Sequence, residues 1–343
     1  MAVPSADTKG VASQKQAWRK PKTCGRLAQG LASVLFCVVL AQGVAYPLGL
    51  DGAAALAMGI QVVAWVPSAV AQSEKFYDFT GMLAYMAVTI FSVLGFLRRF
   101  FDGEMSELLS LQEQDQQQQG TLPLLAMRNL LSVVAAEAPR HLVASALVLI
   151  WITRLGLFLF ARIQRDGHDF RFDRVRDRPL GFLLFWAVQG MWVFFTPLPM
   201  LALHRIHPKG GVGSLHAQDA IGLAVWAAGF ALEVVADNQK RAFKEDAANS
   251  AKFIDVGLWS RCRHPNYAGE MMIWTGFFIF CSRGVVEGVG WLTLISPVFV
   301  TALLVLISAP VLEERADKKY GGQAAYQEYK RKTPLLKFRL LSG

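Results

Sequence analysis

Residues 229–270 read GFALEVVADNQKRAFKEDAANSAKFIDVGLWSRCRHPNYAGE, a polar and basic stretch that joins two apolar segments. Four charged residues of its first half fall on one face of a helix, within about 80° of each other. They are Glu233, Asp237, Arg241 and Lys244. An ionisable group at membrane depth costs roughly 2.5 kcal/mol or more unless it is paired. The two acids therefore predict buried partners.

The second half of the stretch, RCRHPNYAGE at residues 261–270, predicts the start of a new helix. Pro265 suits the first helical position, where its missing N–H is not needed. Asn266 and Glu270 would then lie one turn apart on the same face. The free N–H groups of that first turn, beside Arg263 and His264, would attract an anion such as a phosphate. The alternative for each basic residue is a signal that keeps this end of a membrane helix in the cytosol.

Two motifs in this stretch resemble the steroid 5α-reductase superfamily. They are E-x-x-x-D-x-Q-x-x-x-F from Glu233 and G-L-W-S-x-x-R-H-P-N-Y-x-G-E from Gly257. Within the superfamily, the chain is similar to a multi-spanning branch of mostly unassigned substrate, from about residue 78 to the C-terminus. The resemblance implies an all-α polytopic membrane fold with a cofactor cavity among the C-terminal helices, and NADPH as the cofactor. A more distant similarity is to the isoprenylcysteine carboxyl methyltransferases.

Composition indicates a membrane protein independently of these motifs. Of the 343 residues, 53% are hydrophobic and 18% are charged, and the mean hydropathy is +0.33. The apolar runs predict about seven to eight transmembrane helices. The formal net charge of +9 comes from basic residues that flank these runs, so it indicates helix orientation rather than nucleic-acid binding. The four cysteines have no C-x-x-C spacing, and neither a zinc site nor a disulfide framework is indicated.

The apolar runs divide the chain into four parts. Residues 1–26 are basic and poor in acids, and form either a cytosolic tail or an organelle-targeting presequence. Residues 27–101 contain the N-terminal transmembrane helices. Residues 102–122 form a Gln-rich segment that we expect to be a solvated loop. Residues 123–343 form the membrane catalytic domain that the resemblance implies.

Candidates for the chemistry also precede the polar stretch. Asp78 heads the third apolar run, where it either caps the helix or, as the resemblance implies, donates a proton to the substrate. Arg154 lies inside the fourth run and needs a carboxylate, a carbonyl or a cofactor phosphate as partner. Trp151 stands where the steroid enzymes have a tyrosine that polarises the ketone. Because tryptophan has no phenolic proton, either the carbonyl is activated elsewhere or the substrate is not a 3-keto steroid. The expected catalytic residues are Asp78, Trp151 and Glu270.

Two further segments supply candidates for cofactor binding. In the charged loop at residues 164–179, Asp169 and Arg171 could embrace a ribose and its phosphate; the alternative is a solvated loop. In the C-terminal tail, Arg315 and Tyr320 lie about one helical turn past the last apolar run. The full set of expected cofactor-binding residues is Arg154, Asp169, Arg171, Glu233, Asp237, Arg241, Lys244, Arg263, His264, Asn266, Glu270, Arg315 and Tyr320.

These expectations combine into a membrane reductase. NADPH would reduce a C=C bond in a lipophilic enone, steroid or other lipid that enters from the bilayer, with membrane lipids as the surroundings and no metal or nucleic acid. We expect an integral, multi-pass protein in the endoplasmic reticulum of a eukaryote or in the inner membrane of a bacterium. Two alternatives stay open: a methyltransferase that uses S-adenosylmethionine, and a non-catalytic membrane scaffold or transporter.

Overall fold

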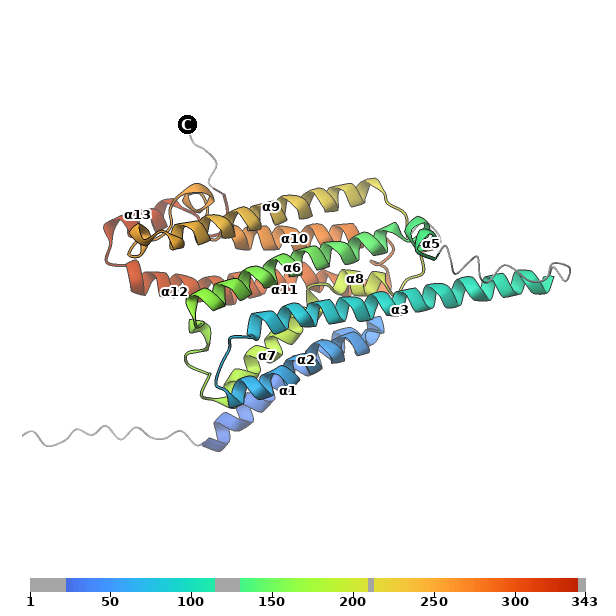
Figure 1. Cartoon of the computed structure of the whole chain (residues 1–343), viewed down its shortest axis with the longest axis horizontal. Helices are drawn as coiled ribbons and strands as arrows, with labels where there is room; N and C mark the ends of the chain where they lie inside the picture. Colours follow the sequence, from blue (N-terminus) through green and yellow to red (C-terminus); the bar gives the residue numbers. More distant parts are fainter. Residues whose placement is uncertain (1–22, 115–129, 209–212, 339–343) are drawn as a thin grey trace, which may run out of the picture.

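A computed structural model describes residues 23–114, 130–208 and 213–338, and its regular elements in these ranges are all helical (Figure 1). Six helical segments are long and apolar enough to cross a membrane. They lie in α1 (Thr23–Leu48), α2 (Asp51–Val70), α3 (Tyr77–Gln114), α6 (Pro139–Asp166), α9 (Ala217–Glu245) and the segment Gly288–Tyr320. The protein is therefore an all-α, multi-pass membrane protein, as the sequence predicts.

Two further helices belong to the same bundle but are short. α7 (Pro179–Phe195) and α10 (Pro265–Cys281) have 17 residues each. At 1.5 Å per residue they are about 26 Å long, less than the roughly 30 Å of a bilayer core. α7 ends near Pro197, and α8 (Leu198–Leu203) follows. In the described residues, six segments thus have the length and hydropathy of a spanning helix, and α7 and α10 pack among them. The expected number of about seven to eight spans stays a prediction.

The last membrane segment is built from four successive helical pieces. They are η4 (Gly288–Leu294), α11 (Ile295–Ala302), the π-helical η5 (Leu303–Ser308) and α12 (Ala309–Tyr320). Pro310 offers no N–H to the carbonyl four residues earlier, so the turns before it widen into a π-helix. The C-terminal α13 (Ala324–Lys332) follows. The remaining short elements are α5 (Leu130–Glu137), η1 (Phe170–Phe172), η2 (Ala247–Asn249) and η3 (Gly257–Ser260).

The Gln-rich segment differs from the expected loop. α3 continues through its first part to Gln114 and, with 38 residues, projects past the neighbouring helices (Figure 1). After Gly103 this part contains mainly Leu, Glu, Ser and Gln and no proline, so helix propensity sustains the helix without an apolar face. Residues 115–129 lie outside the described residues. α5 follows these residues, and with 8 residues it is too short to span a membrane.

Glycines set the distance between α9 and α10. A Cβ atom on Gly229 would lie 2.7 Å from the carbonyl oxygen of Gly269, and one on Gly269 would lie 2.8 Å from the amide nitrogen of Glu233. Gly222 and Gly276 make the same kind of contact two turns along. Because no side chain intervenes, the two backbones touch. This close approach brings the acids of α9 against the first turns of α10.

The polar segments of the chain gather at one end of the bundle, the left end in Figure 1. α6 and α9 end there, α10 begins there, and α12 leads there into α13. The loop between α6 and α7 and the start of α3 lie at the same end. Segments far apart in sequence that we expect to bind one cofactor therefore face the same side.

Candidate functional site

A cluster of polar side chains is buried between α6, α9 and α10. We call it the central cluster, and it consists of Trp151, Arg154, Glu233, Asp237, Asn266 and Glu270. Trp151 is fully buried, and Glu233 and Asp237 are 2% and 5% exposed. All six were candidates from the sequence, and the packing of the three helices brings them together.

Arg154 supplies the buried partner that the two acids of α9 require. Its Nη1 donates to Oε1 of Glu233 at 2.7 Å, and its Nη2 donates to Oδ2 of Asp237 at 2.7 Å. One turn earlier on α6, Nε1 of Trp151 donates to Oε2 of Glu233 at 3.0 Å. The planar guanidinium bridges both carboxylates because they lie one helical turn apart on α9. Arg154 thus has carboxylate partners rather than a carbonyl.

α10 adds two more groups to the central cluster. Nδ2 of Asn266 donates to Oδ1 of Asp237 at 3.3 Å, while Oδ1 of Asn266 is buried without a partner among the described residues. Glu270 follows one turn later and is half-buried. The cluster therefore holds three carboxylates and an orphaned amide oxygen against one guanidinium. The carboxylate and amide oxygens in excess can accept hydrogen bonds from N–H or O–H groups of a ligand.

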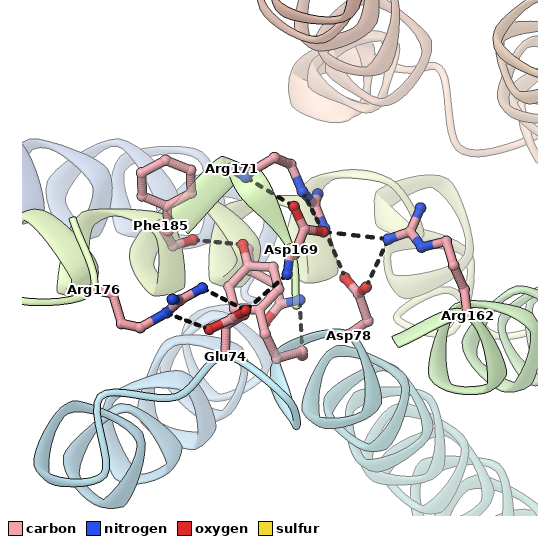
Figure 2. Close-up of polar contacts among 9 residues, drawn as sticks. Glu74, Asp78, Arg162, Asp169, Arg171, Arg176 and Phe185 are labelled. Carbon is pink, nitrogen blue, oxygen red and sulfur yellow. Dashed lines mark hydrogen bonds and ion pairs between the residues drawn. The ribbon is translucent and has the colours of Figure 1, made fainter. Parts of the chain in front are cut away.

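A second set of charges, which we call the loop network, joins the start of α3 to the loop after α6 (Figure 2). Its members are Glu74, Asp78, Arg162, Asp169, Arg171 and Arg176. Arg171 bonds Asp169 through Nη2 at 2.7 Å, and Arg176 bonds Glu74 through Nε and Nη2, both at 2.7 Å. Arg162 reaches Asp78 at 3.2 Å and Asp169 at 3.4 Å. Acidic and basic side chains alternate in the loop network, so each charge has a partner of opposite sign within it.

Asp78 belongs to this network rather than to the central cluster. Its Oδ2 accepts from Arg162 at 3.2 Å and its Oδ1 accepts from Arg171 at 3.4 Å. A carboxylate between two guanidinium groups accepts hydrogen bonds and anchors the loop. The predicted role of Asp78 as a proton donor stays a prediction, and this placement does not favour it.

Four cations lie on the last turns of α6 and α9 and on α12, which meet at the polar end of the bundle. We call Arg162, Lys240, Lys244 and Arg315 the cationic rim. Nζ of Lys240 lies 4.4 Å from the centre of the Trp259 ring, and the guanidinium of Arg315 lies 3.6 Å from the centre of the Phe170 ring. Lys244 is close enough to Arg162 and Arg315 to be repelled by both. Acids lie near three of the four: Arg162 pairs with Asp78 and Asp169, and Lys240 and Lys244 interact electrostatically with Asp237 and Asp166. A group of cations of this kind can attract an anion.

The predicted anion site at the start of α10 is already engaged within the chain. Arg263 and Nε2 of His264 both hydrogen-bond the carboxylate of Glu313 on α12, the histidine at 2.8 Å. Burial lowers the pKa of His264, and its bond to Glu313 opposes that shift. In this structure Arg263 and His264 therefore bind Glu313, whereas the motif predicted that they would bind an external anion such as a phosphate.

Two other predicted residues also lie away from the central cluster. Arg241 is exposed on α9, and its Nε lies 3.9 Å from Oε1 of Glu245. Tyr320 ends α12, where its ring packs on Phe253 at 5.9 Å and on Tyr326 at 5.8 Å. Tyr320 thus belongs to an aromatic group with Phe253 and Tyr326 rather than to the central cluster.

Sequence reasoning missed five residues of these sites: Glu74, Arg162, Arg176, Lys240 and Glu313. Arg162 lies eight residues after Arg154 on α6, a spacing that keeps both on one helix face. Lys240 directly follows Gln239 of the first motif. These two spacings are the signals that could have identified them.

Comparison with known proteins places the chain in a family. The family described as "Protein of unknown function (DUF1295)" matches residues 112–333. The chain belongs to this family. No curated protein and no solved structure matches it. The match contains the central cluster and starts after Glu74 and Asp78, so it begins later than the resemblance read from the motifs.

Proposed function

We propose that this DUF1295 protein is an NADPH-dependent membrane reductase that acts on a C=C bond of a lipophilic enone or other lipid. The observation that carries the proposal is that the central cluster and the cationic rim are neighbours, since Lys240 of the rim is close enough to Asp237 of the cluster to interact with it electrostatically. A dinucleotide has the matching polarity, with anionic phosphates at one end and a neutral carboxamide ring at the other. The wider membership in the steroid 5α-reductase superfamily is part of the same proposal.

The residues present fit such a cofactor. A nicotinamide carboxamide offers two N–H donors and one acceptor, which suits the orphaned Oδ1 of Asn266 and the carboxylate of Glu270. Lys240, Lys244 and Arg315 offer positive charge to the phosphates. Arg154 is not free for a phosphate because both of its terminal nitrogens donate to carboxylates.

In the reaction that we propose, NADPH supplies a hydride to one carbon of the alkene. The chain positions the two partners. Arg154 and Trp151 fix Glu233, and Asp237 in turn orients the amide of Asn266. The second carbon needs a proton, and with Asp78 held by Arg162 and Arg171 we assign that proton to water entering from the polar end.

The experiment that tests the function compares three nucleotides. Purified protein in detergent is heated with NADPH, NADH or S-adenosylmethionine, because a ligand that binds the folded state raises the apparent melting temperature. We expect NADPH to protect more than NADH, since only NADPH carries a 2′-phosphate for the cationic rim. Protection by S-adenosylmethionine alone would assign the protein to the methyltransferases, and equal protection by NADPH and NADH would overturn the role of the rim.

A matched pair of variants localises the effect. Lys244→Gln removes one charge of the cationic rim and should weaken NADPH binding by about tenfold, equivalent to 1.4 kcal/mol, with little change in NADH binding. Arg98→Gln removes an exposed charge on α3, which pairs only with Asp102 among the described residues, and serves as the control. We further propose the endoplasmic reticulum of a eukaryote or the inner membrane of a bacterium as the location, where the polar end would face cytosolic NADPH.

A further inference from the structure

We propose that Glu313 is an internal anion that occupies the phosphate site at the start of α10, and that this contact holds the C-terminal segment 324–338 against the start of α10 until a nucleotide phosphate displaces it. The inference rests on the proposed function only for the identity of the nucleotide. The latch itself is a property of the described chain.

Glu313 collects donors from two separate parts of the chain. Its Oε2 accepts from Arg263 and its Oε1 accepts from Nε2 of His264 at 2.8 Å. Nζ of Lys330, on α13, lies 3.6 Å from Oε2. Two cations and a histidine around one carboxylate form the set of donors that proteins use for phosphates. Glu313 stands where such an anion would bind.

The site keeps donors and acceptors that Glu313 does not satisfy. Nδ1 of His264 and Nε of Arg263 are buried and without partners among the described residues. His264 itself is 5% exposed, and Lys240 of the cationic rim is close enough to interact with it electrostatically. A buried polar atom without a partner costs about 1–3 kcal/mol. An anion with more oxygens than a carboxylate could also accept from the unpartnered Nε–H of Arg263, so a phosphate can compete with Glu313. Nδ1 of a neutral His264 whose Nε2 donates is an acceptor and gains nothing from an anion.

The C-terminal segment is fastened to the same residues by its backbone. The amide of Arg263 donates to the carbonyl of Pro334 at 2.9 Å, and the amide of His264 donates to the carbonyl of Leu335 at 3.1 Å. The hydroxyl of Tyr329 donates to the carbonyl of Trp259 at 2.7 Å. These bonds lay residues 329–335 across the entry to α10. A nucleotide phosphate that reaches the start of α10 must displace part of this segment.

Lys330 couples the two events. Its Nζ bonds Oδ1 of Asp317 at 2.7 Å and lies 3.6 Å from Oε2 of Glu313, so these two acids of α12 hold α13 in place. When Glu313 leaves Arg263 and His264, its new position no longer matches that of Lys330. The displacement of one carboxylate thus removes a contact that holds α13 and the irregular segment that follows it.

The test uses Glu313→Gln with Glu314→Gln as the matched control. The two glutamates are neighbours, but Glu314 is exposed and pairs only with Lys318 among the described residues. Amide hydrogen exchange of residues 324–338 is measured without ligand, and NADPH affinity is measured by titration, both on full-length protein in detergent. We expect Glu313→Gln to exchange about tenfold faster in this segment and to bind NADPH more tightly than wild type. Glu314→Gln should change neither.

The direction of the affinity change decides between two roles of Glu313. If Glu313→Gln binds NADPH more weakly, Glu313 is a direct ligand and the internal-anion proposal is wrong. If exchange in 324–338 is unchanged, there is no latch. Lys330→Gln provides a second route should Glu313→Gln not fold, because it should also accelerate exchange in α13.

Inorganic pyrophosphate separates this proposal from the reductase. Added to wild type, it should accelerate exchange of residues 324–338 whether or not the protein binds NADPH. No acceleration by pyrophosphate would overturn the latch, whereas acceleration without NADPH binding would overturn only the reductase.

Discussion

The ion pairs of Arg154 fix the geometry of the central cluster. Its guanidinium holds Glu233 and Asp237 at 2.7 Å each, while its own side chain is 18% exposed. Removing one member of a buried ion pair costs about 3–5 kcal/mol, because the remaining charge stays buried. The cluster is therefore organised before any ligand arrives, and Asn266 inherits its orientation from Asp237.

Asp169 provides a pH test at the scale of one residue. Burial alone would raise the pKa of this carboxyl, but its pairing with Arg171, and with Arg162, holds the pKa below its usual value. A carboxyl with a lowered folded pKa stabilises the protein above its unfolded pKa of about 3.9, and that stability is lost as the pH falls through the folded pKa. We therefore expect Asp169→Asn to lower the melting temperature at about pH 7 and to have less effect as the pH approaches about 3.

The measurement compares melting temperatures of wild type and Asp169→Asn over this pH range. Asp177→Asn is the control, because this exposed residue lies 4.0 Å from its nearest cation, Arg178. A destabilisation by Asp169→Asn that stays constant with pH would show that the lost packing, and not the charge, matters.

The residue scale also shows what local sequence can reveal. The facing acids of α9, the need of Arg154 for a buried partner and the helix start at Pro265 all follow from helical periodicity and the cost of burying charge. The pairings of Arg263 with Glu313 and of Asp78 with Arg162 do not. They join residues 50 and 84 positions apart, and such contacts depend on how the helices pack, which no local pattern records.

At the scale of elements, the contact between α9 and α10 determines the geometry of the central cluster. The sequence showed two helices with acids and amides on them, but the touching backbones follow from glycines whose role is visible only in the packed structure. α3 shows the opposite case. A polar segment without an apolar stripe predicts a loop, yet helix propensity alone carries α3 to Gln114.

Gly269→Ala tests the close approach of α9 and α10. The new Cβ would meet the carbonyl of Gly229 at 2.7 Å, so the helices must separate. We expect a loss of about 1–3 kcal/mol in stability and weaker NADPH binding, because Asn266 moves away from Asp237. Gly59→Ala is the control, since a Cβ there meets nothing within 4 Å. Unfolding in denaturant reports stability, and an unchanged midpoint for Gly269→Ala would mean that this contact does not position the cluster.

At the scale of the whole molecule, three polar segments must lie on one side of the membrane for the proposed site to exist. The structure gathers the end of α6, the end of α9 and the C-terminal α13 at one end of the bundle (Figure 1). Arg315 lies over Phe170, so α12 touches the loop after α6. The basic residues that flank the apolar runs predicted the orientation of the helices from sequence, and the packed structure adds that these three segments meet.

The topology can be checked along α9 itself. This helix has 29 residues and is about 44 Å long, longer than the roughly 30 Å core of a bilayer. Its two ends must therefore reach water on opposite sides. We expect Lys244→Cys, at the end of α9, and Lys318→Cys, on α12, to react with a membrane-impermeant maleimide from the cytosolic side of sealed vesicles. Ala217→Cys, at the start of α9, should react only from the other side, and wild type serves as the blank. If residues 217 and 244 were labelled from the same side, α9 would not cross the membrane. If residues 244 and 318 were instead labelled from opposite sides, the cationic rim and the C-terminal segment would face different compartments. No single nucleotide could then contact both.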